Sequence, residues 1–233
     1  MRVIVAERLT KTYSRGGVSV DALKDVSFTI DRASLVTFIG PSGSGKTTLL
    51  NLLGALDRPT HGRMVVAGTE VGSLDPRAAA LFRGGTIGFI FQEFNLIPVL
   101  TAYENVEYPL LLIQRVEAAE RRRRVRALLE AVGLADQQDR YPDNLSGGQK
   151  QRIAVARALV TNPQLVLADE PTANLDLANA STVIDTMRRM RDTLGTTFVF
   201  STHDPRVVSE VEHVFRLEDG RLVGQETQAG VAR

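Results

Sequence analysis

Short runs of apolar residues recur along the chain and alternate with segments that have helical spacing. Residues 35–39, 165–168 and 197–200 each form an apolar run without the polar alternation of a half-exposed strand. Such runs are typical of strands that are buried on both faces of a parallel sheet. Residues 46–56 and about 178–193 carry apolar positions three and four apart, which predicts helices. Strands alternating with helices favour an α/β fold with a parallel core sheet.

Two further pairs of short apolar segments have turn residues between them. Residues 3–5 and 26–30 are separated by a stretch that includes the turn-forming residues 14–17, and residues 214–217 and 221–223 flank an Asp-Gly pair. Asp-Gly between apolar segments is typical of a tight hairpin turn. We therefore expect short strands near both ends of the chain, with a hairpin near the second end.

The segment from residue 100 to about residue 134 has helical spacing and no strand signals, which indicates an inserted helical subdomain. It contains four consecutive arginines, residues 121–124. Such a run can bind lipid or nucleic acid, but it can also be the solvated face of a helix. We favour the solvated face because Glu117 and Glu120 offset part of the charge.

Composition limits the possible functions. The 233 residues carry a formal net charge of +1 and include no cysteine, so we expect neither a global attraction to nucleic acid nor a disulfide or thiolate metal site. The first ten residues contain Arg2, Glu7 and Arg8 and no long apolar core, so they do not resemble a signal peptide. The longest apolar run, residues 109–113, is far shorter than the roughly 20 residues that span a bilayer. We expect any membrane-spanning part to belong to another chain.

The apolar run at 35–39 leads into a phosphate-binding sequence. Residues 40–47 match the pattern G-x-x-x-x-G-K-[ST], in which glycines let backbone N–H groups converge on an anion and the following helix adds its positive end. In this pattern Lys46 reaches the β- and γ-phosphates, Thr47 holds Mg²⁺ and Thr48 adds a hydroxyl near the α-phosphate. The candidate nucleotide-binding residues here are Gly40, Pro41, Ser42, Gly43, Ser44, Gly45, Lys46, Thr47 and Thr48. A chance Gly/Ser turn is disfavoured because the motif lies between a predicted strand and a predicted helix, but the loop alone also fits kinases, GTPases and helicases.

Two adjacent carboxylates, Asp169 and Glu170, end the apolar run at 165–168. Because neighbouring strand residues point to opposite sides, the pair can divide two tasks. Asp169 would face Mg²⁺, and Glu170 would polarise the attacking water as a general base. A solvated strand end is the alternative, and the phosphate loop earlier in the chain argues against it.

A third polar sequence, Leu-Ser-Gly-Gly-Gln, covers residues 145–149 and precedes a helical segment. Ser146 can cap that helix, and Gly147 and Gly148 permit close approach of the backbone to a phosphate. These residues alone indicate either a capped helix start or a second anion site, and they do not say whose anion it binds.

Residues 145–149 together with residues 40–47 resemble the ATP-binding cassette (ABC) family, and the similarity extends from about residue 3 to residue 224. The resemblance implies a P-loop NTPase fold of the ABC cassette type, which is α/β with a parallel core sheet, an antiparallel β-subdomain and an inserted helical subdomain. It also divides the chain. Residues 1–92 and 160–233 form the core and β-subdomain, and residues 93–159 hold the Q-loop, the helical subdomain and the signature helix.

The remaining family elements occur in order and imply roles for single residues. Tyr13 matches the aromatic residue that stacks on adenine, and Gln92 matches the Q-loop residue that completes the Mg²⁺ shell. Asp176 matches the D-loop, and His203 matches the histidine that contacts the γ-phosphate and positions the water with Glu170. The resemblance thus implies Glu170 and His203 as catalytic residues, and Thr47, Gln92 and Asp169 as metal ligands. Each of these residues taken alone would more often be structural, so the prediction depends on their order.

The resemblance further implies that two copies of the chain pack head to tail around two ATP molecules. Each ATP with its Mg²⁺ is then held by the phosphate loop of one copy and by Ser146, Gly147, Gly148 and Gln149 of the other. An integral membrane permease is the second implied partner. It would place the chain on the cytoplasmic face of the plasma (inner) membrane without inserting into it, and no nucleic-acid partner is expected.

Residues 91–98, 100–106 and 168–176 are similar to the lipoprotein-release and macrolide-export ATPases, which perform mechanical work through a membrane protein of few spans. One departure is Asn174, which stands where the D-loop commonly has a small residue. Two alternatives come from other classes: a soluble ABC-family ATPase that acts on DNA or ribosomes, and a small-molecule kinase. The first usually has long coiled coils or two cassettes in one chain, and the second would not need residues 145–149.

Overall fold

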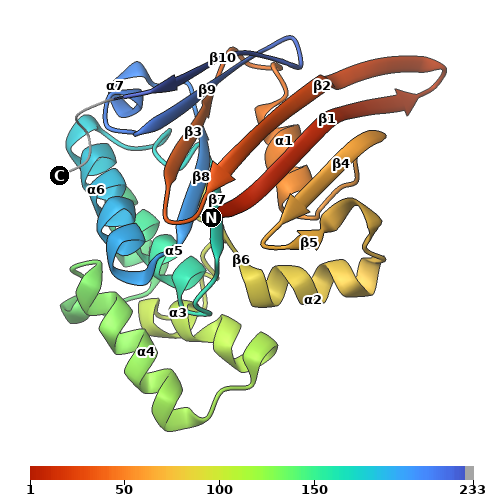
Figure 1. Ribbon diagram of the computed structural model, residues 1–233. Coiled ribbons are helices and arrows are strands. Elements are labelled where there is room, and N and C mark those ends of the chain that lie inside the picture. The colour runs from red at the N-terminus through yellow and green to blue at the C-terminus, as the bar shows by residue number, and fades with distance from the viewer. Residues whose placement is uncertain (229–233) are drawn as a thin grey trace.

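The computed structural model describes residues 1–228, which form two β-sheets and a group of helices (Figure 1). In order across the larger sheet, its strands are β10 (Arg221–Thr227), β9 (His213–Glu218), β3 (Leu35–Ile39), β8 (Thr197–Thr202), β7 (Leu165–Asp169) and β6 (Ile87–Ile90). The strands from β9 to β6 run parallel, and β10 pairs with β9 antiparallel. This arrangement confirms the predicted parallel core sheet and the predicted hairpin.

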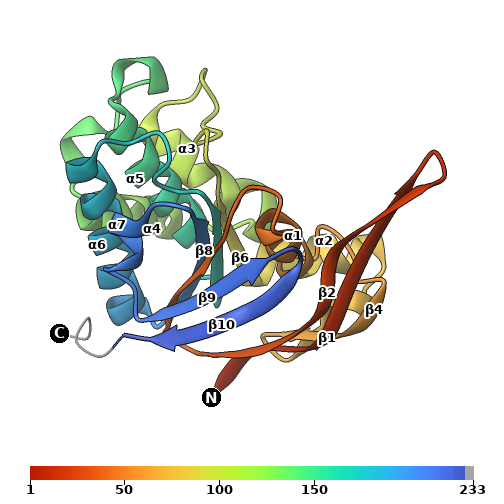
Figure 2. The ribbon, with the colours of Figure 1, turned by 90° about the horizontal axis from the view of Figure 1, so that it is seen from above.

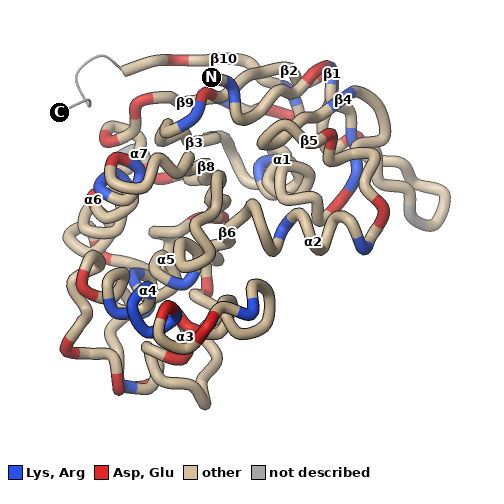
Figure 3. The backbone as a smooth tube through the Cα atoms, turned by 60° about the horizontal axis from the view of Figure 1, so that its bottom comes forward, with Lys and Arg blue, Asp and Glu red and all other residues tan. Residues whose placement is uncertain are grey.

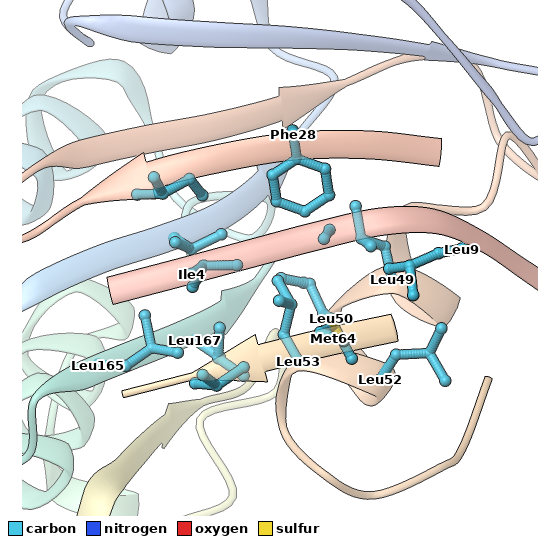
Figure 4. Close-up of a cluster of buried hydrophobic side chains, with 14 of the residues drawn as sticks. Ile4, Leu9, Phe28, Leu49, Leu50, Leu52, Leu53, Met64, Leu165 and Leu167 are labelled. Carbon is cyan, nitrogen blue, oxygen red and sulfur yellow. The ribbon is translucent and has the colours of Figure 1, made fainter. Parts of the chain in front are cut away.

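Helices cover both faces of the parallel sheet, which explains the uninterrupted apolar runs. They are α1 (Lys46–Leu53) on one face, and α5 (Gly147–Leu159) and α6 (Leu177–Leu194) on the other. Leu165 and Leu167 of β7 join a buried cluster with the leucines of α1 (Figure 4). Val166 of β7 and Phe198 of β8 pack with apolar residues of α5 and α6 instead. Alternate residues of β7 therefore face different clusters, and both sets are buried.

The helix predicted at 46–56 ends earlier, at Leu53. Gly54 caps it, because the Gly54 N–H donates to the Leu50 carbonyl and a Cβ at this position would lie 2.9 Å from the ring of Phe89. The residues that follow remain apolar. Apolar spacing alone therefore could not show where the helix stops.

The smaller sheet is antiparallel and contains a long hairpin that the sequence predicts only in part (Figure 2). In order, its strands are β2 (Val18–Asp31), β1 (Arg2–Arg15), β4 (His61–Val66) and β5 (Thr69–Glu70). The expected strands at 3–5 and 26–30 are the base of two strands of 14 residues each. Shifts of register interrupt the pairing, and Arg8 and Asp25 have φ values of 48° and 55°. Such bulges disturb the alternation of faces on which a strand prediction depends.

The helical segment predicted at 100–134 forms helices with a hydrophobic cluster of their own (Figure 1). They are α3 (Ala102–Pro109), a π-helical turn (Leu110–Gln114) and α4 (Ala118–Ala131). Together with α5 they bury Val106, Val125, Leu129 and Ile153, apart from the two clusters on the sheet. The other helical elements are α2 (Pro76–Thr86), α7 (Pro205–Val208) and single 3₁₀ turns at Val71–Ser73, Ala135–Gln137 and Pro142–Asn144. No helix within residues 1–228 is both long and apolar enough to span a bilayer.

The arginine run on α4 is largely ion-paired. Nε of Arg121 lies 2.9 Å from Glu107 on α3, and Glu120 accepts from Arg123 and Arg124, each at 2.7 Å. Hydrogen bonds from these two arginines lower the pKa of Glu120 to about 2. Acidic and basic segments adjoin along α3 and α4 in Figure 3. The pairing offsets the charge within the helical part, as expected for a solvated helix face.

Candidate active site

The candidate residues follow the carboxyl ends of four neighbouring parallel strands. Gly40 follows β3, Gln92 comes two residues after β6, Asp169 ends β7, and His203 follows β8. The carboxyl ends of parallel strands meet at the same edge of a sheet, and open α/β sheets bind ligands there. The fold therefore brings together residues that lie far apart in the sequence.

Two glycines of the phosphate loop occupy positions that a side chain would not fit. Gly40 has a φ of 154°, and a Cβ there would lie 2.0 Å from the carbonyl oxygen of Leu217. Gly45, the N-cap of α1, has a φ of 104°, and its Cβ would lie 2.5 Å from the carbonyl oxygen of Ala22. Close contact with the backbone of β9 and of β2 thus fixes the path of the loop.

Lys46 is folded back over the phosphate loop. Its Nζ donates to the carbonyl oxygens of Gly40 at 2.8 Å and Pro41 at 3.0 Å, and the residue is only 9% exposed. Neither carbonyl carries a charge that would pair with the ammonium. Phosphate oxygens can therefore replace these carbonyls as acceptors, because charge-assisted hydrogen bonds are stronger.

Asp169 and Glu170 line the same cavity, although the strand alternation predicted that they would point to opposite sides. The reason is that β7 ends at Asp169, and Glu170 takes a left-handed conformation with a φ of 48°. Asp169 accepts from Thr47 Oγ1 at 3.0 Å and from Ser201 Oγ at 2.6 Å. Ser201 also accepts from the backbone N–H of Glu170 at 3.0 Å. This serine, which the sequence did not point to, fixes both acidic residues.

Glu170 and His203 face each other across the end of the sheet. Oε1 of Glu170 lies 2.9 Å from Nδ1 of His203. The Glu170 side chain is 15% exposed and the imidazole 68% exposed. Oε2 of Glu170 is buried and has no hydrogen-bond partner among residues 1–228. A buried carboxylate oxygen is usually paired, so this oxygen is suited to receive a water or a ligand.

These groups enclose a cavity of about 650 Å³, a usual size for a small-molecule site. Its lining consists of Ala22, Pro41, Ser42, Gly43, Gly45, Lys46, Thr47, Thr48, Gln92, Asp169, Glu170 and His203. The predicted residues Gly40, Ser44 and Tyr13 do not line it. Ala22 does, although no sequence signal marks it, because only the passage of β2 beside the loop brings it there.

Tyr13, on β1, is 42% exposed and does not belong to the lining of this cavity. Its hydroxyl donates to Oδ2 of Asp57 at 2.9 Å. Burial and this hydrogen bond raise the pKa of Tyr13, while the side chain of Thr48 acts in the opposite direction. Thr48 lines the cavity, so the Tyr13 hydroxyl lies near one residue of that lining.

The four residues expected to act across a dimer lie elsewhere. Ser146 is the N-cap of α5, where its Oγ accepts from the Gln149 N–H at 3.3 Å while Oε1 of Gln149 accepts from the Ser146 N–H at 2.8 Å. This reciprocal capping box confirms the expected helix start. Ser146, Gly147, Gly148 and Gln149 are all absent from the lining of the cavity that residues 1–228 form.

A family model covers these elements. The model of the ABC transporter family matches residues 23–173, which include the phosphate loop, the signature sequence and the acidic pair. The chain belongs to the ABC transporter family. It is therefore an ATP-hydrolysing cassette, and its fold is that of the ABC cassette, as the sequence predicts.

Individual ABC proteins resemble the chain over nearly its whole length. An uncharacterized ABC transporter ATP-binding protein of Thermotoga maritima is 47% identical over 95% of this chain and 94% of its own. The lipoprotein-releasing system ATP-binding protein LolD of Bordetella avium is 42% identical over 94% of each chain. A dimeric, post-hydrolysis structure of the cassette MJ0796 bound to ADP and Pi is 40% identical, with a TM-score of 0.87 over 97% of this chain and 99% of that one. CbiO1 from Clostridium perfringens, part of the transporter complex cbiONQ, is 29% identical, with a TM-score of 0.89 over 97% and 88% of the two chains.

Within this ABC cassette, the signature helix packs directly on the helix that follows the D-loop. A Cβ at Gly148 would lie 2.2 Å from Oδ1 of Asn179 on α6. Asn179 is itself fixed by Asp176, whose carboxylate accepts from the Asn179 backbone at 2.9 Å and from its side chain at 2.7 Å. The D-loop also contacts the Q-loop, because Nδ2 of Asn174 donates to the carbonyl of Gln92 at 3.1 Å. Gly148 therefore has a packing role in addition to the phosphate approach expected from the sequence.

The variant Gly148→Ala should be less stable than the wild type by about 1–3 kcal/mol, because the added methyl group overpacks the contact with Asn179. Adding Asn179→Ala should recover part of the lost stability, since it removes the atoms nearest to the new methyl group. Urea unfolding measures the stability of the single and the double variant. The matched control is Gly85→Ala on α2, where a Cβ meets nothing within 4 Å and helix propensity favours alanine. Equal unfolding midpoints for Gly148→Ala and the wild type would contradict the contact.

Proposed function

We propose that the chain is the ATP-hydrolysing subunit of a membrane transporter and works as one half of a dimer that encloses two ATP molecules. The observation that carries the proposal is the separation of two half-sites in one chain. The cavity holds the phosphate loop, Asp169, Glu170 and His203, whereas Ser146 begins a helix that does not reach it. The dimeric structures of MJ0796 support a partner copy as the source of the missing half.

In the proposed site, ATP binds along the phosphate loop and the first turn of α1. Backbone N–H groups of residues 42–45 surround the phosphates, Lys46 binds the β- and γ-phosphates, and Thr48 lies on the α-phosphate side. Tyr13 stacks on adenine. The position of Lys46 over the loop supports its role, because the ammonium already lies against the surface that would bind the phosphates.

The donor set at the centre of the cavity fits Mg²⁺. The Thr47 hydroxyl and the Asp169 carboxylate provide oxygen atoms that lie 3.0 Å apart, and Gln92 belongs to the same lining. Magnesium prefers oxygen ligands and usually keeps few protein groups beside phosphates and water. Thr47, Asp169 and Gln92 would hold the ion, which when bound neutralises charge on the β- and γ-phosphates.

Glu170 and His203 carry the proposed chemistry of hydrolysis. Glu170 accepts a proton from the attacking water, and its unpaired Oε2 supports this role. His203 holds Oε1 of Glu170 and, being exposed, can also contact the γ-phosphate. Ser146, Gly147, Gly148 and Gln149 of the second copy would complete the binding of that phosphate, and Asp176 would bring the D-loop to the same interface.

Hydrolysis should therefore depend on protein concentration in the absence of a membrane partner. The rate per molecule is expected to fall as dilution separates the copies, since a single cassette lacks the second half of the phosphate clamp. Steady-state ATP hydrolysis measured across a dilution series, with mass photometry on the same samples, tests this. A rate per molecule that stays constant down to clearly monomeric concentrations would overturn the shared site.

The proposed membrane partner binds an apolar groove beside the Q-loop. The groove has a volume of about 710 Å³ and is lined by Leu81 of α2 and by Leu112 and Ile113 of the π-helical turn, all at least half exposed. Phe91 also lines it, directly before Gln92 of the nucleotide cavity. A short apolar segment of an integral membrane permease suits this lining and would be one residue away from the ATP site. Residues 93–159 would then form the subdomain that relays closure between the two.

Membrane association should fail when the groove is made charged. Leu112→Asp is expected to lose co-purification with an integral membrane protein, because burying the carboxylate in an apolar interface is unfavourable. Val223→Asp, at another exposed apolar position on β10, is the matched control. Retained membrane co-purification by Leu112→Asp would reject the groove. Recovery of only ribosomes or DNA with the wild type would reject the transporter and favour a soluble ABC-family ATPase.

Within transporters, we infer the branch that performs mechanical work on lipoproteins or exported compounds. The 42% identity to LolD supports this inference. The partner would be a permease of few spans, which keeps the chain on the cytoplasmic face of the membrane. Identification of the co-purifying protein by mass spectrometry tests the branch, and a permease with many spans and no large outer domain would argue against it.

A further inference from the structure

A lysine and an aspartate hold the side chain of Tyr13, the first at a face of the ring and the second at the hydroxyl. Nζ of Lys11 lies over the ring, 4.8 Å from its centre. The Lys11 side chain is only 12% exposed, whereas Tyr13 is 42% exposed. A cation over an aromatic face is attracted by the electrons of the ring. One face of Tyr13 is thus covered by an ammonium group, while the residue as a whole stays partly exposed.

Asp57 joins these two side chains. Its Oδ1 accepts from Lys11 Nζ at 2.6 Å and from the Arg58 N–H at 2.7 Å, and its Oδ2 accepts from the Tyr13 hydroxyl at 2.9 Å. Burial alone would raise the pKa of Asp57, but the hydrogen bonds from Lys11, Arg58 and Tyr13 outweigh it and lower the pKa. The carboxylate therefore stays charged at neutral pH and keeps both partners.

The same aspartate belongs to the turn that ends α1. The N–H groups of Leu56 and Asp57 donate to the Asn51 carbonyl at 2.9 and 3.3 Å. Lys11 Nζ also donates to the Arg58 carbonyl in this turn, at 2.8 Å. Because α1 begins with Lys46 of the phosphate loop, the carboxylate that binds the tyrosine hydroxyl lies in the turn after the other end of the same eight-residue helix.

We propose that Lys11 and Asp57 are positioning residues that hold Tyr13 as a one-sided stacking platform for the nucleobase, at a fixed distance from the phosphate loop. The proposal rests on the ATP site described above. A ring fixed before binding loses little freedom when the base stacks on it, which favours affinity. Stacking depends on flat aromatic area and not on the polar edge of the base. The platform therefore strengthens binding of purine nucleotides and separates ATP from GTP only weakly.

Inorganic tripolyphosphate has the phosphates of ATP and no base. Its affinity therefore distinguishes a loss of base stacking from a loss of phosphate binding by the loop. Calorimetric titration of Lys11→Met and Asp57→Asn should show affinity for ATP and GTP reduced about two- to ten-fold and affinity for tripolyphosphate unchanged. The KM for ATP should rise more than kcat falls. Lys11→Arg, which keeps the cation, should recover most of the affinity. Lys24→Met on β2 is the matched control and should bind both ligands as the wild type does.

Two results would overturn the proposal: unchanged ATP affinity in both variants, or an equal loss of ATP and tripolyphosphate affinity. Tyr13→Phe keeps the ring and removes the hydroxyl that binds Asp57 and lies near Thr48, so it gives the same comparison if Lys11→Met does not fold. A wild-type chain that bound neither ligand would instead reject the proposed ATP site. A loss of affinity for ATP and GTP in the variants, with tripolyphosphate affinity and kcat intact, would support the platform.

Discussion

Glu170→Gln should bind ATP about as well as the wild type and hydrolyse it about 10²–10⁴ times more slowly. Glutamine keeps the shape of the side chain and can still bond to His203, but it cannot accept a proton from the attacking water. Asp169, the neighbouring carboxylate, cannot readily replace it because both of its oxygens already accept from Thr47 and Ser201. The variant should therefore retain ATP between two copies of the chain.

Three measurements on this variant test the role together. Titration gives ATP affinity, phosphate release gives turnover, and mass photometry with ATP shows whether a dimer accumulates. The matched control is Glu130→Gln on the exposed face of α4, which removes a carboxylate far from the cavity and should leave all three values unchanged. Turnover at the wild-type rate in Glu170→Gln would exclude Glu170 as the general base.

Lys46→Ala should weaken nucleotide binding itself, by about 10- to 100-fold, because a hydrogen bond to a charged group contributes about 1.5–3 kcal/mol. The loss should apply equally to ATP and to tripolyphosphate, since Lys46 contacts phosphate and not the base. The same substitution also releases the carbonyls of Gly40 and Pro41, so the loop loses two of its internal hydrogen bonds. Thermal unfolding without ligand measures that second effect separately.

Arg77→Ala is the control for this variant, because Arg77 is an exposed cation in the first turn of α2, outside the cavity lining. It should bind ATP as the wild type does. An ATP affinity unchanged in Lys46→Ala would show that the phosphates bind elsewhere. It would remove the basis for placing ATP along the loop.

The sequence predicted best those strands that are buried on both faces, because burial alone sets their pattern of apolar residues. Residues 165–168 and 198–200 are apolar at every position because helices cover both faces of the sheet. The long hairpin of β1 and β2 was predicted only at its base, because bulges near Arg8 and Asp25 disturb its alternation. β6 was missed because Ile87–Ile90 is short and includes a glycine, Gly88, whose Cβ would lie 2.3 Å from the Ala158 carbonyl.

The residues of the candidate site also fall into a group that the sequence predicted and a group that it did not. Motifs with local geometry, such as the phosphate loop and the capped helix start at Ser146, could be predicted because their hydrogen bonds join residues close in sequence. Ser201, Ala22 and Asp57 could not, because each acts on a residue that only folding brings near. The side to which Glu170 points also depended on a left-handed backbone that strand alternation does not show.

By itself, the sequence determined the local chemistry: a loop of glycines between a strand and a helix, an acidic pair at a strand end, and a capped signature helix. The tertiary structure decided which of these share a cavity. Gln92, Asp169 and His203 meet the phosphate loop because parallel strands end at one edge of the sheet. Ser146 does not meet it because α5 packs against α6, where Gly148 contacts Asn179. That separation of two halves within one chain is the physical reason to expect a second copy at the ATP site.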